Sequence, residues 1–289
     1  MILSQKRHEK GLWWDRNWPV LEGCTPCSPA CDNCFAAGYA HRFEKSLPYL
    51  RGLTTTDGKW NGAVALRKDQ LKLPSTIKKP TVWFLTERSD LFHPAVPFEY
   101  ILAVLTHAVM AQHHRYMILT KRPERMAEFF KWMDTEAPHR VETMRDCFWF
   151  GVTVWDQASA DRSLPYLLGI RVAHRFISVE PMLGTINLEI IPGVFFDAGM
   201  PVEWQRLSIP GLDLVICGGE TGLKARPVHP GWVRSLSDQC TAAKVPFFFK
   251  QWGEWAPRFD GVGREWPTRV GKKAAGRLID GKEYLELPL

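Results

Sequence analysis

Four cysteines stand within eleven residues near the start of the sequence, on a stretch that also carries proline, serine and glycine. They are Cys24, Cys27, Cys31 and Cys34. The rest of the chain holds only three more, and each is isolated: Cys147, Cys217 and Cys240. Thiolates gathered on one short loop are suited to bind a single soft metal centre. We therefore take this loop as the candidate site of the chemistry and its four cysteines as candidate metal ligands, and we expect the isolated three to pack as small hydrophobic residues.

Two three-cysteine spacings overlap in the loop. One is Cys24-x6-Cys31-x2-Cys34, and the other is Cys27-x3-Cys31-x2-Cys34. The second is the spacing by which radical S-adenosylmethionine (SAM) enzymes hold three irons of a [4Fe–4S] cluster, with the fourth iron left open for SAM. A fourth protein ligand would close that iron, so Cys24 and Cys27 are alternatives for the first ligand.

Zinc and disulfides are the competing explanations of the cysteines. Structural zinc sites usually take two ligand pairs from separated segments, and four cysteines within eleven residues would form a cramped site. Disulfides need an oxidising compartment, but the first residues, MILSQKRHEKGLWW, lack the apolar core and cleavage site of a signal peptide. We therefore expect a cytoplasmic protein with free thiols.

Composition places the chain among ordinary globular proteins. Its 289 residues are 45% hydrophobic and 24% charged, and no apolar run approaches the length of a membrane span, so we expect no membrane association. The formal net charge is +6, which is compatible with an anionic partner such as nucleic acid or a nucleotide. Thirteen tryptophans are available for packing or for stacking on a ligand.

Short β-rich apolar runs alternate with helical patterns over most of the chain. The predicted strands cover 81–86, 116–120, 148–154, 174–179, 212–217 and 246–249, and the predicted helices cover 35–43, 98–112, 124–133, 158–168 and 232–243. Continuous apolar strands between helices indicate a parallel sheet covered by helices.

With a short strand before the cysteine loop there are about seven repeats. This count favours an α/β fold with a full or partial (β/α) barrel, with a doubly wound sheet as the alternative. We expect a single domain over 1–289, with a surface excursion near 46–80 and a C-terminal extension near 254–289.

Polar residues follow the end of nearly every predicted strand. They are Glu87, Asp90, Lys121, Arg122, Asp156, Gln157, Glu180, Glu220, Lys250 and Gln251. In a barrel the carboxyl ends of the strands carry the active site, so these residues are candidates to surround one ligand. Simple strand termination by polar residues is the alternative explanation.

The ordered motifs of the chain resemble one known family. They are the cysteine loop, SDLFH at 89–93, LTKRPERM at 119–126, SVEPMLG at 178–184, GGETG at 218–222, ARPVHPGWVRSLSDQC at 225–240 and FFFKQWG at 247–253. Together they resemble a phage-associated bacterial family of unknown function, known for a three-cysteine motif and related to radical SAM proteins. The resemblance extends from about residue 13 to 255. It implies a radical-SAM-like fold with Cys24, Cys31 and Cys34 as the motif cysteines, and this sequence departs from the pattern by adding Cys27.

A radical SAM site needs groups for each part of the cofactor. The amino group of SAM needs an acceptor, for which Glu87, Ser89 and Asp90 are candidates, and its carboxylate needs a cation such as Lys121. Glu180 is a candidate for the ribose hydroxyls. Gly218 and Gly219 would let the backbone approach a ligand beside Glu220, although a tight turn into a helix explains these glycines equally well.

A basic and aromatic set is the candidate for substrate binding. It consists of Arg122, Arg226, His229, Lys250 and Trp252, and it suits a phosphorylated, base-bearing ligand. His93, which follows an apolar pair, is expected to be a hydrogen-bonded structural residue.

These observations predict a radical SAM enzyme with a [4Fe–4S] cluster and SAM as cofactors. We expect it to modify or repair nucleic acid or a nucleotide in a phage-related setting, with flavodoxin or ferredoxin as the kind of electron donor. The first alternative is a zinc- or iron–sulfur-stabilised nucleic-acid-binding protein without turnover. The second is a metal-dependent hydrolase such as a nuclease, for which the sequence lacks a compact motif of the HExxH kind. No residue is assigned a catalytic role.

Overall fold

The computed structural model describes residues 4–137, 146–189 and 211–288. Within them, seven strands form one parallel sheet with the order β1-β4-β5-β6-β7-β8-β9. The strands are β1 (Arg16–Trp18), β4 (Val82–Leu85), β5 (Arg115–Thr120), β6 (Phe148–Thr153), β7 (His174–Val179), β8 (Leu214–Gly218) and β9 (Phe247–Gln251). The predicted strands are present and differ only at their ends.

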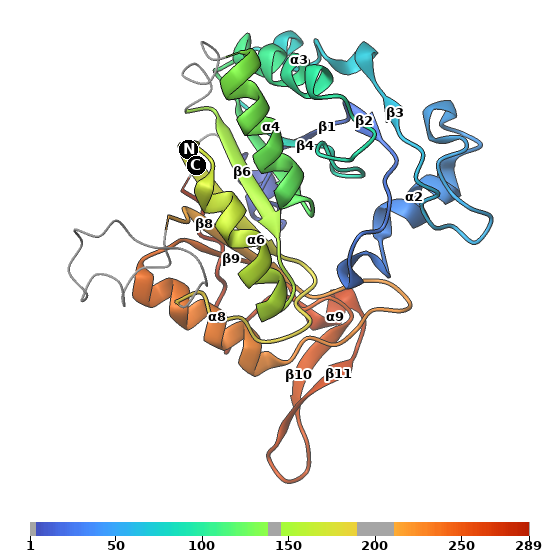
Figure 1. Cartoon of the computed structure of the whole chain (residues 1–289). Coiled ribbons are helices and arrows are strands. Elements are labelled where there is room, and N and C mark those ends of the chain that lie inside the picture. Colours follow the sequence, from blue (N-terminus) through green and yellow to red (C-terminus); the bar gives the residue numbers. More distant parts are fainter. Residues whose placement is uncertain (1–3, 138–145, 190–210, 289) are drawn as a thin grey trace, which may run out of the picture.

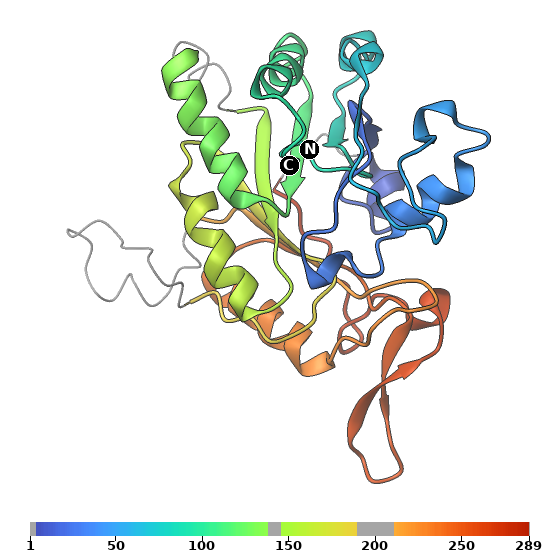
Figure 2. The same ribbon diagram turned by 45° about the vertical axis from the view of Figure 1, so that its right-hand side comes forward.

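The strand order separates the two folds that the sequence left open. A doubly wound sheet reverses its order at a switch point, whereas here each strand is added beside the preceding one. Because crossover connections are right-handed, an order without reversal places the connecting helices on one face. These helices are α3 (Phe98–Val109), α4 (Pro123–Glu136), α6 (Gln157–Gly169) and α8 (Pro230–Ala243). Figures 1 and 2 show them following one another around the outside of a curled sheet.

The two faces of the sheet bury different side chains, because successive strand residues point to opposite faces. The outer face packs against the helices through residues such as Tyr116, Ile118 and Phe150. The inner face contributes Phe84, Phe176 and Phe248 to a separate cluster with Trp13. The Trp13 ring lies 4.7 Å from the Phe84 ring and 5.9 Å from the Phe176 ring, measured between centroids. The concave side is therefore filled at its base by aromatic packing.

The sheet forms an open partial barrel. β1 and β9 are its edges, and they do not pair with each other within the described residues. The C-terminal segment covers part of the β9 edge, where the Phe249 amide donates to the carbonyl of Tyr284 and the Glu286 amide donates to that of Phe247.

Smaller elements surround this sheet. α2 (Phe35–Phe43) follows the cysteine loop, β2 (Leu21–Glu22) pairs antiparallel with β3 (Ala65–Leu66), and β10 (Trp255–Phe259) pairs antiparallel with β11 (Glu265–Arg269). The short helices α1 (Gln5–His8) and α9 (Lys272–Ala275) lie near the ends of the described chain. Residues 46–80 hold three 3-10 turns besides β3, η2 (Pro48–Leu50), η3 (Lys68–Gln70) and η4 (Pro74–Thr76), and Leu50, Leu53 and Trp60 pack against α2.

Two of the polar residues at strand ends serve the start of a helix. The Asp156 carboxylate accepts from the Ser159 amide, and the Ser159 hydroxyl accepts from the Asp156 amide, which is a capping box for α6. The Gln157 side chain donates to Asp161 and accepts from the Asn187 amide. For these positions the structural explanation is sufficient.

Candidate functional site

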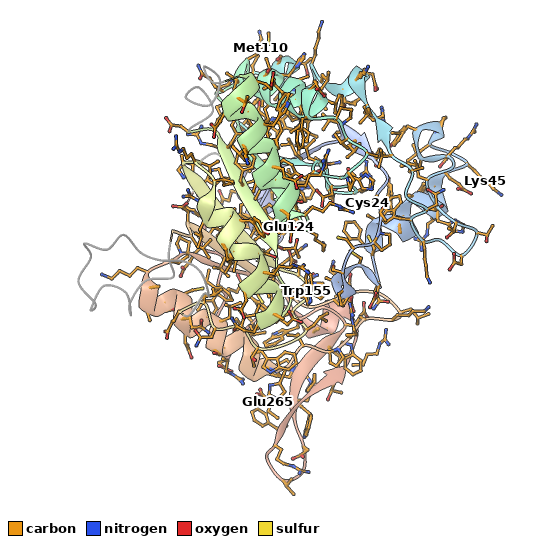
Figure 3. All side chains as sticks on the ribbon, in the orientation of Figure 1. Cys24, Lys45, Met110, Glu124, Trp155 and Glu265 are labelled. Carbon is orange, nitrogen blue, oxygen red and sulfur yellow. The ribbon has the colours of Figure 1, made fainter. Side chains whose placement is uncertain are left out.

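The cysteine loop connects β2 to α2 at the carboxyl edge of the sheet. Gly23 has a φ of +87°, and a Cβ there would collide with the carbonyl oxygen of Ala63, so this position requires glycine. Gly23 also forms a parallel bridge with Ser89, just beyond β4. Figure 3 shows Cys24 between the sheet with its helices and the α2 segment. The residue that precedes Cys24 is therefore held beside the end of β4.

Residues beyond β4 and β5 hold the first half of the loop. Asp90 is buried and accepts from the Thr120 hydroxyl (2.7 Å), the Lys121 amide (3.1 Å) and Nη1 of Arg122 (2.8 Å). Arg122 also donates through Nη2 to the Thr25 carbonyl (2.7 Å), and its Nη1 lies 3.8 Å from Sγ of Cys24. Arg122 therefore connects the Asp90 carboxylate to the cysteine loop.

A histidine supports the same half of the loop. The Ala95 amide donates to Nδ1 of His93, which leaves the proton on Nε2, and Nε2 donates to the Thr25 hydroxyl over 2.8 Å. Burial lowers the pKa of His93 and favours this neutral form. The expectation of a hydrogen-bonded structural histidine is confirmed.

Residues beyond β8 hold the second half of the loop. The Glu220 carboxylate accepts from Nδ2 of Asn33 (3.0 Å) and forms an ion pair with Arg226 (2.8 Å). Arg226 in turn donates to the Pro29 carbonyl (2.9 Å) and pairs with Asp32 (3.3 Å). Two distant strand ends, those of β5 and β8, thus hold the loop from opposite sides.

The four loop thiols have different surroundings. All are free, with Cys27 exposed and the other three half-buried. A hydrogen bond from the Cys27 thiol, aided by the charge of Lys121, lowers the pKa of Cys31 to about 5, and the same bond raises the pKa of Cys27. Burial and the charge of Asp90 raise the pKa of Cys24 to about 11, against the opposing effect of Arg122.

A polar group lies above the aromatic base of the inner face. Nζ of Lys250 on β9 lies 3.1 Å from Oε1 of Glu180, which follows β7. The Ser178 hydroxyl donates to the same carboxylate. Burial raises the pKa of Glu87, and the positive charges of Arg88 and Lys250 oppose this rise. Glu87 therefore interacts electrostatically with Lys250.

Two buried hydroxyls at the ends of strands were not foreseen from the sequence. Thr86 follows β4 and Thr153 ends β6, and the Oγ1 atoms of both are buried without a hydrogen-bond partner within the described residues. Thr153 lies on the inner face because its strand neighbour Trp149 does, four residues earlier. This alternation is the sequence signal that would have identified it.

Comparison with known proteins places the chain in a family. The model of a family described as "Protein of unknown function (DUF5131)" matches residues 9–288. The chain belongs to this family. No curated protein matches it.

Two solved structures of spore photoproduct lyase, one of a mutant and one complexed with dinucleoside spore photoproduct, show distant similarity to this DUF5131 protein. Their TM-scores are 0.38 and 0.33, each at 9% identity, covering 88% of this chain and 68% of theirs. Similarity at this level supports no inference about function. The part of this chain that the structure describes contains no helix long and apolar enough to cross a membrane.

The site residues expected from the sequence fall into two groups in this DUF5131 protein. Glu180 and Lys250 pair with each other on the inner face, whereas the side chains of Glu87 and Lys121 form no hydrogen bond or ion pair with the described residues. The others are engaged within the protein, as Ser89 is by donating to the Leu21 carbonyl and Asp90 by accepting from four donors. Arg122, Glu220 and Arg226 hold the loop, and His229 caps α8 by accepting from the Gly231 amide.

Trp252 and the two glycines also differ from the roles expected of them. Trp252 is 2% exposed and donates to the Leu278 carbonyl, so its ring is not available for stacking on a ligand. A Cβ on Gly219 would collide with the Trp252 carbonyl, so Gly219 permits close packing of backbone on backbone. A Cβ on Gly218 would lie 2.7 Å from Oε1 of Glu180, so Gly218 makes room for that carboxylate.

The loop has the donor set of an iron–sulfur centre. Thiolates are the protein ligands of such clusters, and four free thiols lie on one short segment, with Arg122 beside Cys24 and the charge of Lys121 acting on Cys31. Across the described residues, no three His, Cys, Asp or Glu side chains are already arranged to hold a metal ion. Binding by this loop therefore requires the cysteine side chains to turn toward one point. The isolated Cys147, Cys217 and Cys240 are buried in the outer-face core, as expected.

Proposed function

We propose that the protein is a radical SAM enzyme that binds a [4Fe–4S] cluster through three cysteines of the 24–34 loop. We further propose that it modifies or repairs nucleic acid or a nucleotide in the cytoplasm, in a phage-related setting, with electrons from a flavodoxin- or ferredoxin-like donor. When bound, the cluster and SAM supply one-electron chemistry that cleaves a carbon–sulfur bond of SAM.

The observation that carries the proposal is the position of the cysteine loop. It lies at the carboxyl edge of a partial (β/α) barrel, where Arg122 beyond β5 and Glu220 beyond β8 both contact it. Because parallel strands all end at this edge, a ligand bound next to the loop also meets residues of the other strands.

Individual residues have distinct tasks in this proposal. Cys31 and Cys34 are common to both spacings and are ligands in either case, and we take Cys24 as the third on the basis of the family resemblance. Arg122 positions Cys24 and places positive charge beside its sulfur. Lys121, whose charge acts on Cys31, is the cation best placed for the carboxylate of SAM.

The inner-face polar group is suited to the rest of SAM. Glu180 and Lys250 offer an acceptor and a donor side by side, and the Thr86 and Thr153 hydroxyls are buried with unused hydrogen-bonding capacity among the described residues. A ligand with amino and hydroxyl groups would satisfy them. The aromatic base beneath, including Trp13 and Phe176, excludes water from below.

Anaerobic reconstitution tests the proposal. Purified protein is incubated with iron and sulfide, and iron, sulfide and zinc are measured, followed by reduction in the presence of SAM. We expect about four iron and four sulfide per chain, and methionine with 5′-deoxyadenosine after reduction. A colourless protein holding one zinc per chain, or a cluster that never cleaves SAM, would reject the proposal and support a binding protein without turnover.

A further inference from the structure

The β10–β11 hairpin is an arm that extends away from the sheet. Figures 1 and 2 show it projecting beyond α9, and β10 and β11 pair only with each other among the described strands. Its turn is closed by Asp260, which accepts from the amides of Val262 and Arg264 and from the Arg264 side chain. The arm is thus ordered by its own contacts.

The base of the arm is attached to the residues that hold the cysteine loop. The Glu254 amide donates to the Glu220 carbonyl, and Nε1 of Trp255 donates to the Ala225 carbonyl over 2.8 Å. Nη2 of Arg269 donates to the Gly222 carbonyl over 3.0 Å. Since Glu220 also binds Asn33 of the cysteine loop, the arm and the loop share one support.

The charge that the arm presents to solvent is positive. The acidic groups of its strands and turn are both paired, Asp260 with Arg264 and Glu265 with Arg234 of α8, and Glu254 at its base is half-buried and accepts from the Gly222 amide. Arg258 on β10 and the neighbouring Lys272 and Lys273 of α9 are exposed, and none of these three forms an ion pair within the described part of the chain. The exposed charges without an ion-pair partner on this part of the described surface are therefore cations.

Large apolar side chains are exposed on the same arm. Phe259 is 73% exposed, Trp266 is 55% exposed, and Val262 at the turn is exposed as well. Arg258 and Trp266 are directly opposite each other in the strand register, so a guanidinium and an indole share one face of the hairpin. Phe259 is opposite Glu265 in the register and therefore lies on the other face of the hairpin. An exposed indole beside an unpaired guanidinium is the kind of surface on which unpaired bases stack.

We propose that the face of the β10–β11 hairpin that carries Arg258 and Trp266 is a docking arm for single-stranded nucleic acid, with Trp266 stacking on a base and Arg258, Lys272 and Lys273 contacting phosphates. Unpaired bases stack on exposed aromatic rings, and phosphates are drawn to unpaired cations. The proposal rests on the proposed function, because it identifies the substrate as a nucleic acid strand. Glu220, which contacts both the arm and the cysteine loop, would keep that strand near the loop. Docking itself needs neither cluster nor SAM.

Fluorescence anisotropy tests the proposal on the full chain. The probe is a fluorescein-labelled single-stranded oligonucleotide of about 16 nucleotides, as DNA and as RNA. We compare wild type with R258S/W266A and with K272S/K273S. The matched control is Y166A/R171S, which removes an exposed aromatic ring and an exposed cation from the region of α6. Circular dichroism and thermal unfolding verify that each variant is folded.

We expect each arm variant to bind about tenfold or more weakly, the control to bind like wild type, and the affinity of wild type to fall with salt. Equal affinity of wild type and both arm variants would overturn the proposal, as would a change from dimer to monomer in R258S/W266A, which would make the arm an interface between copies. Iron content and SAM cleavage are measured separately on the same variants. A wild type that binds the probe through the arm but never cleaves SAM would reject the proposed function alone, and the reverse result would reject the docking arm alone.

Discussion

Nζ of Lys250 lies 3.1 Å from Oε1 of Glu180, and this contact spans the intervening strand β8. The two residues belong to β9 and the end of β7, so they meet only because β8 carries no side chain at Gly218, where a Cβ would lie 2.7 Å from the same oxygen. Gly218, Glu180 and Lys250 are therefore packed together at the carboxyl edge of the sheet.

Gly218→Ala should displace the Glu180 carboxylate while leaving the fold intact, because the atom it meets is the end of a flexible side chain. Lys250→Met should remove the partner of the same carboxylate. We expect both variants to retain wild-type iron content after reconstitution and to bind SAM about tenfold more weakly, a loss of roughly 1.4 kcal/mol. Isothermal titration with SAM measures this effect. Wild-type affinity for SAM in both variants would show that Glu180 and Lys250 do not contribute to SAM binding.

Gly219→Ala should be far more harmful to stability, because its Cβ meets the backbone carbonyl of Trp252, which cannot turn away. We expect a loss of about 3 kcal/mol in the free energy of unfolding. Urea unfolding followed by circular dichroism measures it. Gly169→Ala is the control, since a Cβ at that helical position meets nothing within 4 Å and should be neutral or stabilising. A Gly219→Ala protein as stable as the control would contradict the observed packing.

Cys31→Ala and Cys34→Ala should each prevent cluster assembly, because both residues belong to each three-cysteine spacing. Cys24→Ala should be severe and Cys27→Ala mild. Iron content and the visible spectrum after anaerobic reconstitution give the result, with the buried Cys147→Ala as the control that keeps its iron. Full iron content in Cys31→Ala or Cys34→Ala would rule out the ligand assignment, and a reversed order for Cys24 and Cys27 would select the shorter spacing.

Arg122→Met should destabilise the protein by about 3 kcal/mol, because it leaves the buried Asp90 carboxylate without its cationic partner. The double variant Asp90→Asn with Arg122→Met should recover part of this loss, since the remaining buried group is then neutral. Urea unfolding of the two single variants and the double variant measures the coupling. Strict additivity would show that the Asp90–Arg122 contact does not hold the loop.

Stability should fall as the pH is lowered from 7.5 to 5.5, in part through His114. Nε2 of His114 donates to the Pro74 carbonyl, and its buried Nδ1 has no partner within the described residues. Burial lowers the pKa of His114 below its usual value of 6.5, so the unfolded chain binds a proton there before the folded chain does. The stability this group contributes is complete above pH 6.5 and is lost as the pH falls below it. Urea unfolding at the two pH values should show a smaller decrease in the free energy of unfolding for His114→Gln than for wild type. An equal decrease in the two proteins would show that His114 does not contribute to the pH dependence.

Much of the local structure was readable from the sequence. Runs such as Phe148–Thr153 are almost wholly apolar and bounded by polar turns, which is typical of a strand buried on both faces, and the helical pattern located α6 to within one residue at each end. Its cap, Asp156, was instead taken as a candidate to surround a ligand. The cysteine loop and the isolated buried cysteines were also evident, because spacing and type are local properties. The alternation of strands and helices then restricted the fold to two classes.

Tertiary structure decided which residues remain available for a ligand. Ser89, Asp90 and Trp252 look like site residues in the sequence, but the fold engages or buries them, whereas Thr86 and Thr153 look unremarkable and prove to be buried with free hydroxyls among the described residues. The contact of Asn33 with Glu220 joins residues 187 positions apart, and no local pattern signals it. Sequence pattern determines elements because backbone preferences and periodicity act over a few residues. Strand order and curvature determine the site, because they set which distant strand ends meet.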